Sequence, residues 1–415
     1  MIVSVAPSSV LSLPPFDHQP RTRLIFGVNS VDRAGELARE LGAKKVLLVT
    51  DPGLVAAGHA GHVHRILESA GLAVTMFDKA RENPTTRCVD DCTVLAKSAG
   101  IDLIVGLGGG SSMDTAKGCN FLLTNGGRMQ NYWGVGKATK PMLPLIAIPT
   151  TAGTGSECQS SALIADEHTH QKMACLDPKA TACIAILDPT LTISQPTAVT
   201  AHTGIDAIAH AVETTVTKKR NPLSLMYSHE AFKLTVTSLS QVLVAPSDVE
   251  ARGRMLLGAA LAGLAIENSM LGAAHAAANP LTAHYDIVHG EAVGILLPLV
   301  VRFNGQNPAI CQAYAELASA PEIACASDGA QPALEALIAR LESLLNAAKI
   351  ARSLADCGVE HSMTKTLAKE AAKQWTAAFN PRPLTVEDFA ALYEAAFQPR
   401  GDGDGKLGGL RTGLA

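Results

Sequence analysis

The sequence has few aromatic residues, no dominant sign of charge and no long apolar run. Phe, Trp and Tyr make up 4% of the 415 residues, and the formal net charge is −4 at pH 7. A balance this close to neutrality gives no sign of a nucleic-acid partner or of an anionic membrane surface. No apolar stretch reaches the roughly 18 residues that a membrane-spanning helix needs. We therefore expect neither nucleic acid nor membrane as a partner.

The cysteines lack the spacing of a disulfide framework or a zinc site. There are nine of them, an odd number, and Cys88 and Cys92 lie four apart without a second pair. Reduced thiols in a cytoplasmic protein are the expectation from this pattern. The N-terminal stretch 1–20 lacks a basic region and is interrupted by prolines. It is interpreted as an arm rather than a signal peptide.

Two hydrophobic patterns divide the chain. Within residues 23–195, short apolar runs typical of buried strands alternate with helical patterns that end at glycine. The expected strands are 44–51, 72–78, 102–110 and 144–151, and the expected helices are 33–43, 59–71 and 88–100. This alternation predicts a parallel sheet covered on both faces. From Pro196 onward only helical patterns remain, so we predict an α/β domain over 1–195 and an all-helical domain over 196–415.

Two glycine-rich loops are expected at the carboxyl edge of this sheet. The stretch GLGGGSSMDTAKG (106–118) follows a strand and opens a helix, where bare amides and the positive end of the helix dipole favour a diphosphate. We expect Ser111 and Ser112 to cap that helix. A second loop, PTTAGTGSE (149–157), also follows an apolar strand. Asp51 ends another strand, where its carboxylate suits ribose hydroxyls and favours NAD over NADP, although a helix cap is an equally good interpretation.

One carboxylate and three imidazoles form a candidate metal site. Asp206 and His210 lie four apart in GIDAIAHAVE (204–213), so they share one helix face, and His275 and His289 follow in 273–291. A surface ion pair is the common alternative for such an Asp/His pair. The apolar surroundings argue against it, because a buried charge needs a partner. These ligands suit Fe(II) or Zn(II), and an open position would make the ion a Lewis acid toward a substrate oxygen.

Together these motifs resemble the iron-containing (group III) alcohol dehydrogenase family. GGGSSMDTAK, PTTAGTGSE, the Asp188–Pro189 turn, GIDAIAHAVE and the two histidine segments carry the resemblance, which extends over most of the chain. It implies an N-terminal Rossmann-like NAD-binding domain, a helical C-terminal domain and an active site in the cleft between them. It also implies that Asp206, His210, His275 and His289 are the metal ligands. The implied cofactor-binding residues are Asp51, Gly109, Gly110, Ser111, Asp114, Thr150, Thr151 and Lys172.

The sequence departs from the family pattern at one position near the expected substrate pocket. Many members carry HAxAHxLG, whereas this chain has HAAANPLT, so that Asn279 stands where a histidine implicated in proton transfer is expected. Asparagine forms hydrogen bonds but does not titrate near neutral pH. His284, or water together with the cofactor ribose, is the expected replacement in the proton path.

We therefore expect reversible hydride transfer between NAD(H) and a primary alcohol/aldehyde pair, assisted by Fe(II) or Zn(II), in a homodimer or higher homo-oligomer. Three alternatives remain. One is a metal-independent reductase such as a maleylacetate reductase, which the intact ligand set opposes. The second is a lyase resembling dehydroquinate synthase. The third is a degenerate, non-catalytic structural member, for which Asn279 is the only argument.

Overall fold

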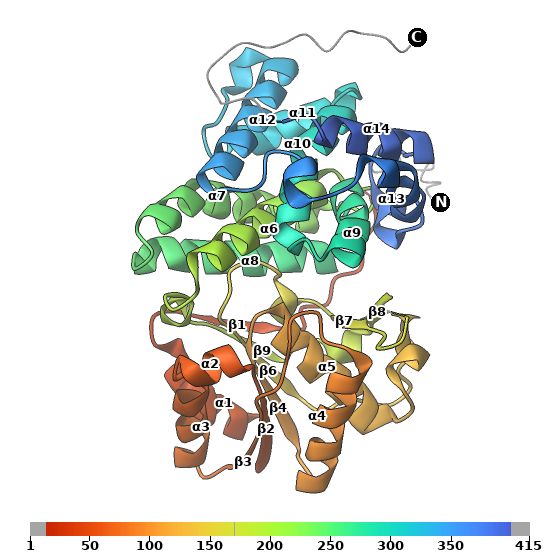
Figure 1. The fold of residues 1–415 in the computed structure, drawn as a ribbon. Coiled ribbons are helices and arrows are strands. Elements are labelled where there is room, and N and C mark those ends of the chain that lie inside the picture. Colours follow the sequence, from red (N-terminus) through yellow and green to blue (C-terminus); the bar gives the residue numbers. More distant parts are fainter. Residues whose placement is uncertain (1–13, 170, 400–415) are drawn as a thin grey trace, which may run out of the picture.

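The computed structural model describes residues 14–169 and 171–399. The glycine-rich stretch 401–415 and most of the N-terminal arm expected over 1–20 lie outside these residues. Every strand of the described chain falls between residues 23 and 187, and only helices follow. Figure 1 shows the resulting shape, an α/β half with a helical half beside it.

A six-stranded sheet, parallel throughout, forms the centre of the first half. Its order is β1-β9-β6-β4-β2-β3. The strands are β1 (Arg23–Phe26), β2 (Lys45–Val49), β3 (Ala73–Phe77), β4 (Leu103–Gly108), β6 (Leu145–Pro149) and β9 (Ile184–Leu187). All residues of β4 and β6 are buried, which explains their near-continuous apolar sequences, LIVGLG and LIAIP. The parallel sheet predicted from the sequence is confirmed.

Helices cover both faces of this sheet. On one face, α1 (Ala34–Glu40) and α3 (His59–Ser69) pack against it, with the short α2 (Pro52–Ala56) beside them. On the other face lie α4 (Thr86–Ala99) and α5 (Gly110–Asn125). Two cores therefore enclose the sheet, as expected for alternating strands and helices.

A second, three-stranded sheet was not predicted. It contains β5 (Gly134–Val135), β8 (Lys172–Leu176) and β7 (Ser161–Ala165) in that order, and β7 pairs with β8 in antiparallel fashion. Buried positions alternate with half-buried ones along β7 and β8, apart from the exposed Lys172 at the start of β8, because only one face packs against the first half's core. Such short half-buried strands give a weak hydrophobic signal in sequence. This sheet matters for function because Lys172 begins β8.

The second half consists of helices around α6 (Thr197–Val216). The others are α7 (Pro222–Val244), α8 (Val249–Glu267), α9 (Ala273–Tyr285), α10 (His289–Asn304), α11 (Pro308–Ser319), α12 (Ala330–Ala347), α13 (Thr364–Ala371) and α14 (Val386–Ala396). Residues 204–216 of α6 are all buried, as expected from their apolar sequence. Small residues permit this packing: a Cβ on Gly258 of α8 would lie 2.6 Å from Thr235 Cγ2 of α7.

The second glycine-rich loop joins the two halves. A Cβ on Gly153 would lie 2.5 Å from Thr203 Cβ on α6. Gly155 has a φ of +62°, and a Cβ there would lie 2.7 Å from the carbonyl oxygen of Ala259 on α8. The loop backbone therefore packs directly against the helix that carries Asp206 and His210.

Two other sequence-based expectations concern membranes and thiols. Over the described residues, no helix combines the length and apolarity needed to cross a membrane. Free thiols include the buried Cys92, Cys119, Cys158 and Cys175, in agreement with the expectation of reduced thiols.

Candidate metal centre and cofactor loops

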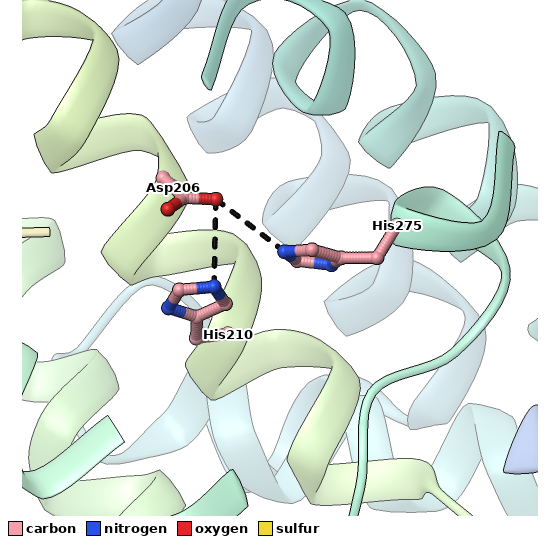
Figure 2. A group of neighbouring side chains, drawn as sticks. All are labelled: Asp206, His210 and His275. Carbon is pink, nitrogen blue, oxygen red and sulfur yellow. Dashed lines mark ion pairs between the residues drawn. The ribbon is translucent and has the colours of Figure 1, made fainter. Parts of the chain in front are cut away.

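Three of the four predicted ligands meet in the interior of the helical half. Asp206 and His210 project from one face of α6, and His275 reaches them from the first turn of α9 (Figure 2). The Oδ1 atom of Asp206 lies 3.4 Å from Nε2 of His210 and 3.4 Å from Nε2 of His275. The ligand atoms of these three residues all lie within 4.8 Å of one another.

The geometry and the unsatisfied polar atoms of this cluster fit a divalent metal. Asp206 Oδ1 and His275 Nε2 are buried without a hydrogen-bond partner, although such atoms are costly to leave unpaired. Ligands about 2.1 Å from a tetrahedral metal ion are separated by about 3.4 Å, which matches the two measured distances. Oxygen and imidazole nitrogen donors suit Fe(II) and Zn(II) alike.

His289, the fourth predicted ligand, lies at the more open side of the cluster. Its Nε2 is 3.8 Å from Asp206 Oδ1, and its side chain is 31% exposed compared with 6% for Asp206. His289 is the first residue of α10, and Gly290 packs that turn against α6. A Cβ on Gly290 would lie 2.0 Å from the carbonyl oxygen of His202, so only glycine allows this approach.

The protonation of the cluster is consistent with metal binding. Burial lowers the pKa of His210 to about 4 and that of His289 to about 3. Burial raises the pKa of Asp206, but the three imidazoles lower it by more. Together they hold the pKa of this carboxyl below its ordinary value. Two neutral imidazoles and an ionised carboxylate are the forms that bind metals.

Glu213 was not among the predicted site residues, yet it contacts a ligand. Its Oε2 lies 2.6 Å from His275 Nδ1, and both side chains are 4% exposed. Burial lowers the pKa of His275, but Glu213 and Asp206 outweigh it and raise the value to about 9. The sequence held a signal for this residue: Glu213 lies seven residues after Asp206 and three after His210, on the same helix face.

The two glycine-rich loops meet at the carboxyl ends of β4 and β6, which are neighbours in the sheet. A Cβ on Gly109 would lie 3.2 Å from Thr151 Cγ2, and one on Gly110 would lie 2.9 Å from Thr154 Cγ2. The N-cap of α5 is Gly109, and no side chain caps this end. A bare, uncapped helix start between close loops fits the diphosphate of a dinucleotide.

The expectation that Ser111 and Ser112 cap α5 is wrong. The helix begins at Gly110, so both serines lie inside its first turn. Ser112 Oγ instead donates to Asp51 Oδ2 at 3.3 Å. Asp51 is the N-cap of α2 and accepts a hydrogen bond from the backbone N–H of Leu54 at 3.1 Å. The helix-cap interpretation of Asp51 therefore holds. The hydrogen bond from Ser112 also places the Asp51 carboxylate beside the first glycine-rich loop. Its ribose-binding role stays a prediction.

Two further predicted cofactor residues interact with each other. Burial raises the pKa of Asp114 to about 6, while the positive charges of Lys117 and Lys172 oppose this rise. Burial lowers the pKa of Lys172, and Asp114 and Asp206 act in the opposite direction. Lys172 Nζ also donates to Asn83 Oδ1 at 3.3 Å. Lys172 thus lies within electrostatic reach of both the loop helix α5 and the metal cluster. Thr150, the remaining predicted position, is buried where β6 ends and donates its backbone N–H to Gly108 O.

The two predicted proton-transfer residues have other partners. Asn279, one turn after His275 on α9, donates from Nδ2 to Gln374 Oε1 at 3.1 Å. His284 Nε2 lies 2.8 Å from Glu370 Oε2 of α13, and its side chain is 36% exposed. The contact with Glu370 gives His284 a surface role that needs no proton relay. The relay itself stays a prediction.

Comparisons with known proteins identify the family. A model of the iron-containing alcohol dehydrogenases matches residues 20–189, and one of the Fe-containing alcohol dehydrogenase family's C-terminal part matches residues 200–397. The chain belongs to the iron-containing alcohol dehydrogenase family. It is 34% identical to alcohol dehydrogenase 4 of Schizosaccharomyces pombe over 390 residues. This aligned region covers 94% of this chain and 89% of the relative. It is also 34% identical to the NAD-dependent methanol dehydrogenase of Bacillus methanolicus, over 90% of this chain and 97% of the relative.

A solved structure leads to the same family. The crystal structure of a 1,3-propanediol oxidoreductase superposes with a TM-score of 0.89 at 34% identity, over 92% of this chain and all of that chain. As a member of this family, this chain is an NAD-dependent oxidoreductase that uses a divalent metal. The predicted family, fold class, NAD and metal are confirmed, and the alternative activities are not favoured.

Proposed function

We propose that this enzyme interconverts a small primary alcohol and its aldehyde, with Asp206, His210, His275 and His289 holding the metal. The observation that carries the proposal is the buried Asp206 Oδ1, which faces three imidazole Nε2 atoms at 3.4–3.8 Å and has no hydrogen-bond partner. When bound, the divalent metal supplies Lewis acidity that lowers the pKa of an alcohol hydroxyl, and NAD accepts the hydride.

The chain's own residues position the reactants. We assign the cofactor diphosphate to the uncapped start of α5 at Gly109–Ser111, between this loop and Thr150 and Thr151. Asp51, at the same sheet edge, would accept hydrogen bonds from the adenosine ribose. Asp114 and Lys172 would bind the rest of the cofactor, because the charge of Lys172 interacts with both Asp114 and the metal ligand Asp206.

The unequal exposure of the ligands indicates how substrate enters. Asp206, His210 and His275 are 4–6% exposed, so water is largely excluded from their side. His289 is 31% exposed and marks the side from which an alcohol would approach. Asn279 cannot carry the alcohol proton, which would leave through His284, water or cofactor hydroxyls.

The domain division, assembly and location also remain proposals. We place the boundary near residue 195, because the last strand ends at Leu187 and α6 begins at Thr197. A homo-oligomer is consistent with the exposed apolar side chain of Phe26 on edge strand β1. Buried free thiols such as Cys92, Cys119 and Cys158 suit a cytoplasmic location.

A chelator experiment tests the proposed function. We expect NADH formation from short primary alcohols, loss of that activity after metal removal, and recovery with Fe(II) or Zn(II). Full activity in metal-free protein would instead support a metal-independent reductase. Metal-dependent turnover of another substrate without net NADH formation would support a lyase.

A further inference from the structure

Glu213 links a metal ligand to the start of the helix that carries it. The same carboxylate that contacts His275 also accepts hydrogen bonds from two backbone N–H groups at the start of α9. Its Oε2 lies 3.1 Å from Gly272 N, and its Oε1 lies 2.7 Å from Ala274 N. Gly272 is the N-cap of α9 and offers no side-chain cap. A residue on α6 thus performs the capping of α9.

The glycine at the N-cap leaves room for the Glu213 side chain at the start of α9. A Cβ on Gly272 would lie 3.1 Å from Glu213 Oε1 and 3.0 Å from Asn380 Oδ1. With glycine present, the carboxylate reaches the open N–H groups of α9, where a negative charge also stabilises the helix dipole. The position of the first turn, which includes His275, is therefore tied to α6.

The hydrogen bond to Nδ1 determines which nitrogen of His275 is available to a metal. A carboxylate only accepts, so Nδ1 carries the proton that is donated to Glu213 at 2.6 Å. In the neutral imidazole, the lone pair is then on Nε2, the atom that lies 3.4 Å from Asp206 Oδ1. The orientation of the ring and its tautomer both follow from Glu213.

We propose that Glu213 is a positioning residue that presents His275 Nε2 to the metal and raises the affinity of the site. The proposal rests on the metal site of the proposed function. It differs from a purely structural role, because a cap that only stabilises α9 would leave the metal affinity unchanged once the protein is folded. A carboxylate bound to the second nitrogen of a ligating histidine typically contributes 10–100-fold to metal affinity.

Glu213→Gln changes the hydrogen bond to His275 and keeps one of the two capping bonds. The glutamine carbonyl can still accept from Ala274 N. The amide group in place of Oε2 no longer accepts from Gly272 N, and it donates to His275 Nδ1, which favours the tautomer with a proton on Nε2. Glu267→Gln is the matched control. Glu267 also accepts from a backbone N–H, that of Ser160 at 2.9 Å, but from the end of α8 and without contact to a ligand.

The experiment is a zinc titration of the full-length metal-free proteins against a chromophoric chelator, with Co(II) absorption as a second reporter. We expect zinc affinity to fall about 10–100-fold in Glu213→Gln and to stay at the wild-type value in Glu267→Gln. Equal zinc affinity in the two variants would overturn the proposal. Absence of zinc binding in the wild type would overturn the proposed function itself.

If Glu213→Gln does not fold, the wild-type protein still gives a decision. NMR of the zinc-loaded, ¹⁵N-histidine-labelled chain, assigned with a His275→Gln sample, reports the protonated nitrogen. A proton on Nδ1 of His275 supports the proposal, and a proton on Nε2 refutes it.

Discussion

Replacement of Gly290 by alanine provides a quantitative test of how α10 places His289. The alanine Cβ would lie 2.0 Å from His202 O and 2.6 Å from His202 C, both backbone atoms that cannot rotate away. Reaching even a 3.0 Å contact requires a shift of about 1 Å in the first turn of α10, whereas functional metal sites keep ligand distances within about 0.2 Å. The substitution should therefore remove His289 from the site.

We expect Gly290→Ala to lower zinc affinity at least about 10-fold and the free energy of unfolding by about 1–3 kcal/mol. Gly61→Ala in α3 is the control, because nothing lies within 4 Å of its added Cβ. It should stabilise the protein by up to about 1 kcal/mol and leave zinc affinity unchanged. Zinc titration and urea unfolding measure both quantities. If Gly290→Ala had the same zinc affinity and the same free energy of unfolding as Gly61→Ala, the close contact of Gly290 with α6 would not position His289.

Three other predictions concern the cofactor, a buried acid and the proton path. Asp51→Gly should narrow the preference for NAD(H) over NADP(H) in kcat/KM, and a wild-type preference for NADPH would contradict the placement of Asp51. Burial raises the pKa of Glu157 from 4.5 to about 7. Between these two values the folded protein keeps a proton that the unfolded chain has lost, so the free energy of unfolding falls as pH rises. The loss reaches roughly 3 kcal/mol once pH exceeds 7. Urea unfolding of Glu157→Gln should therefore show a stability relative to wild type that increases from pH 5 to pH 8, and a constant difference would refute this. Asn279→His should alter the pH–rate profile near neutrality. His284→Gln should lower kcat more in the wild type than in the Asn279→His variant. An unchanged kcat in His284→Gln would exclude proton transfer through His284.

The elements with strong hydrophobic periodicity were predictable from the sequence. The runs that became β2, β4 and β6 are buried on both faces, so their sequences are almost wholly apolar. The edge strand β3 is mostly half-buried, but its sequence AVTMF is still apolar enough to be predicted. The buried helix α6 carried its Asp206/His210 pair in an apolar context that marked the site. By contrast, β7 and β8 are short and half-buried, and their pairing depends on contacts with α5 that no local pattern reveals.

Contacts between distant segments explain the remaining differences. Ser112 faces Asp51 rather than the end of α5, because the helix starts at Gly110, two residues earlier than a Ser111 cap would require. Glu213 lies 62 positions from His275 in sequence, and only the packing of α9 on α6 brings them together. His284 pairs with Glu370 of α13, a partner that no spacing within its own helix could indicate.

The number of metal ions bound per chain shows whether Asp206, His210, His275 and His289 hold the metal. We would measure bound divalent metal by mass spectrometry in freshly purified wild type, His275→Ala, His289→Ala and the control His284→Ala, in which the replaced histidine lies in the Glu370 ion pair. We expect about one ion per chain in wild type and control, and loss of stoichiometric metal in the other two variants while the fold persists. Full metal occupancy in His289→Ala would contradict this assignment of the ligands.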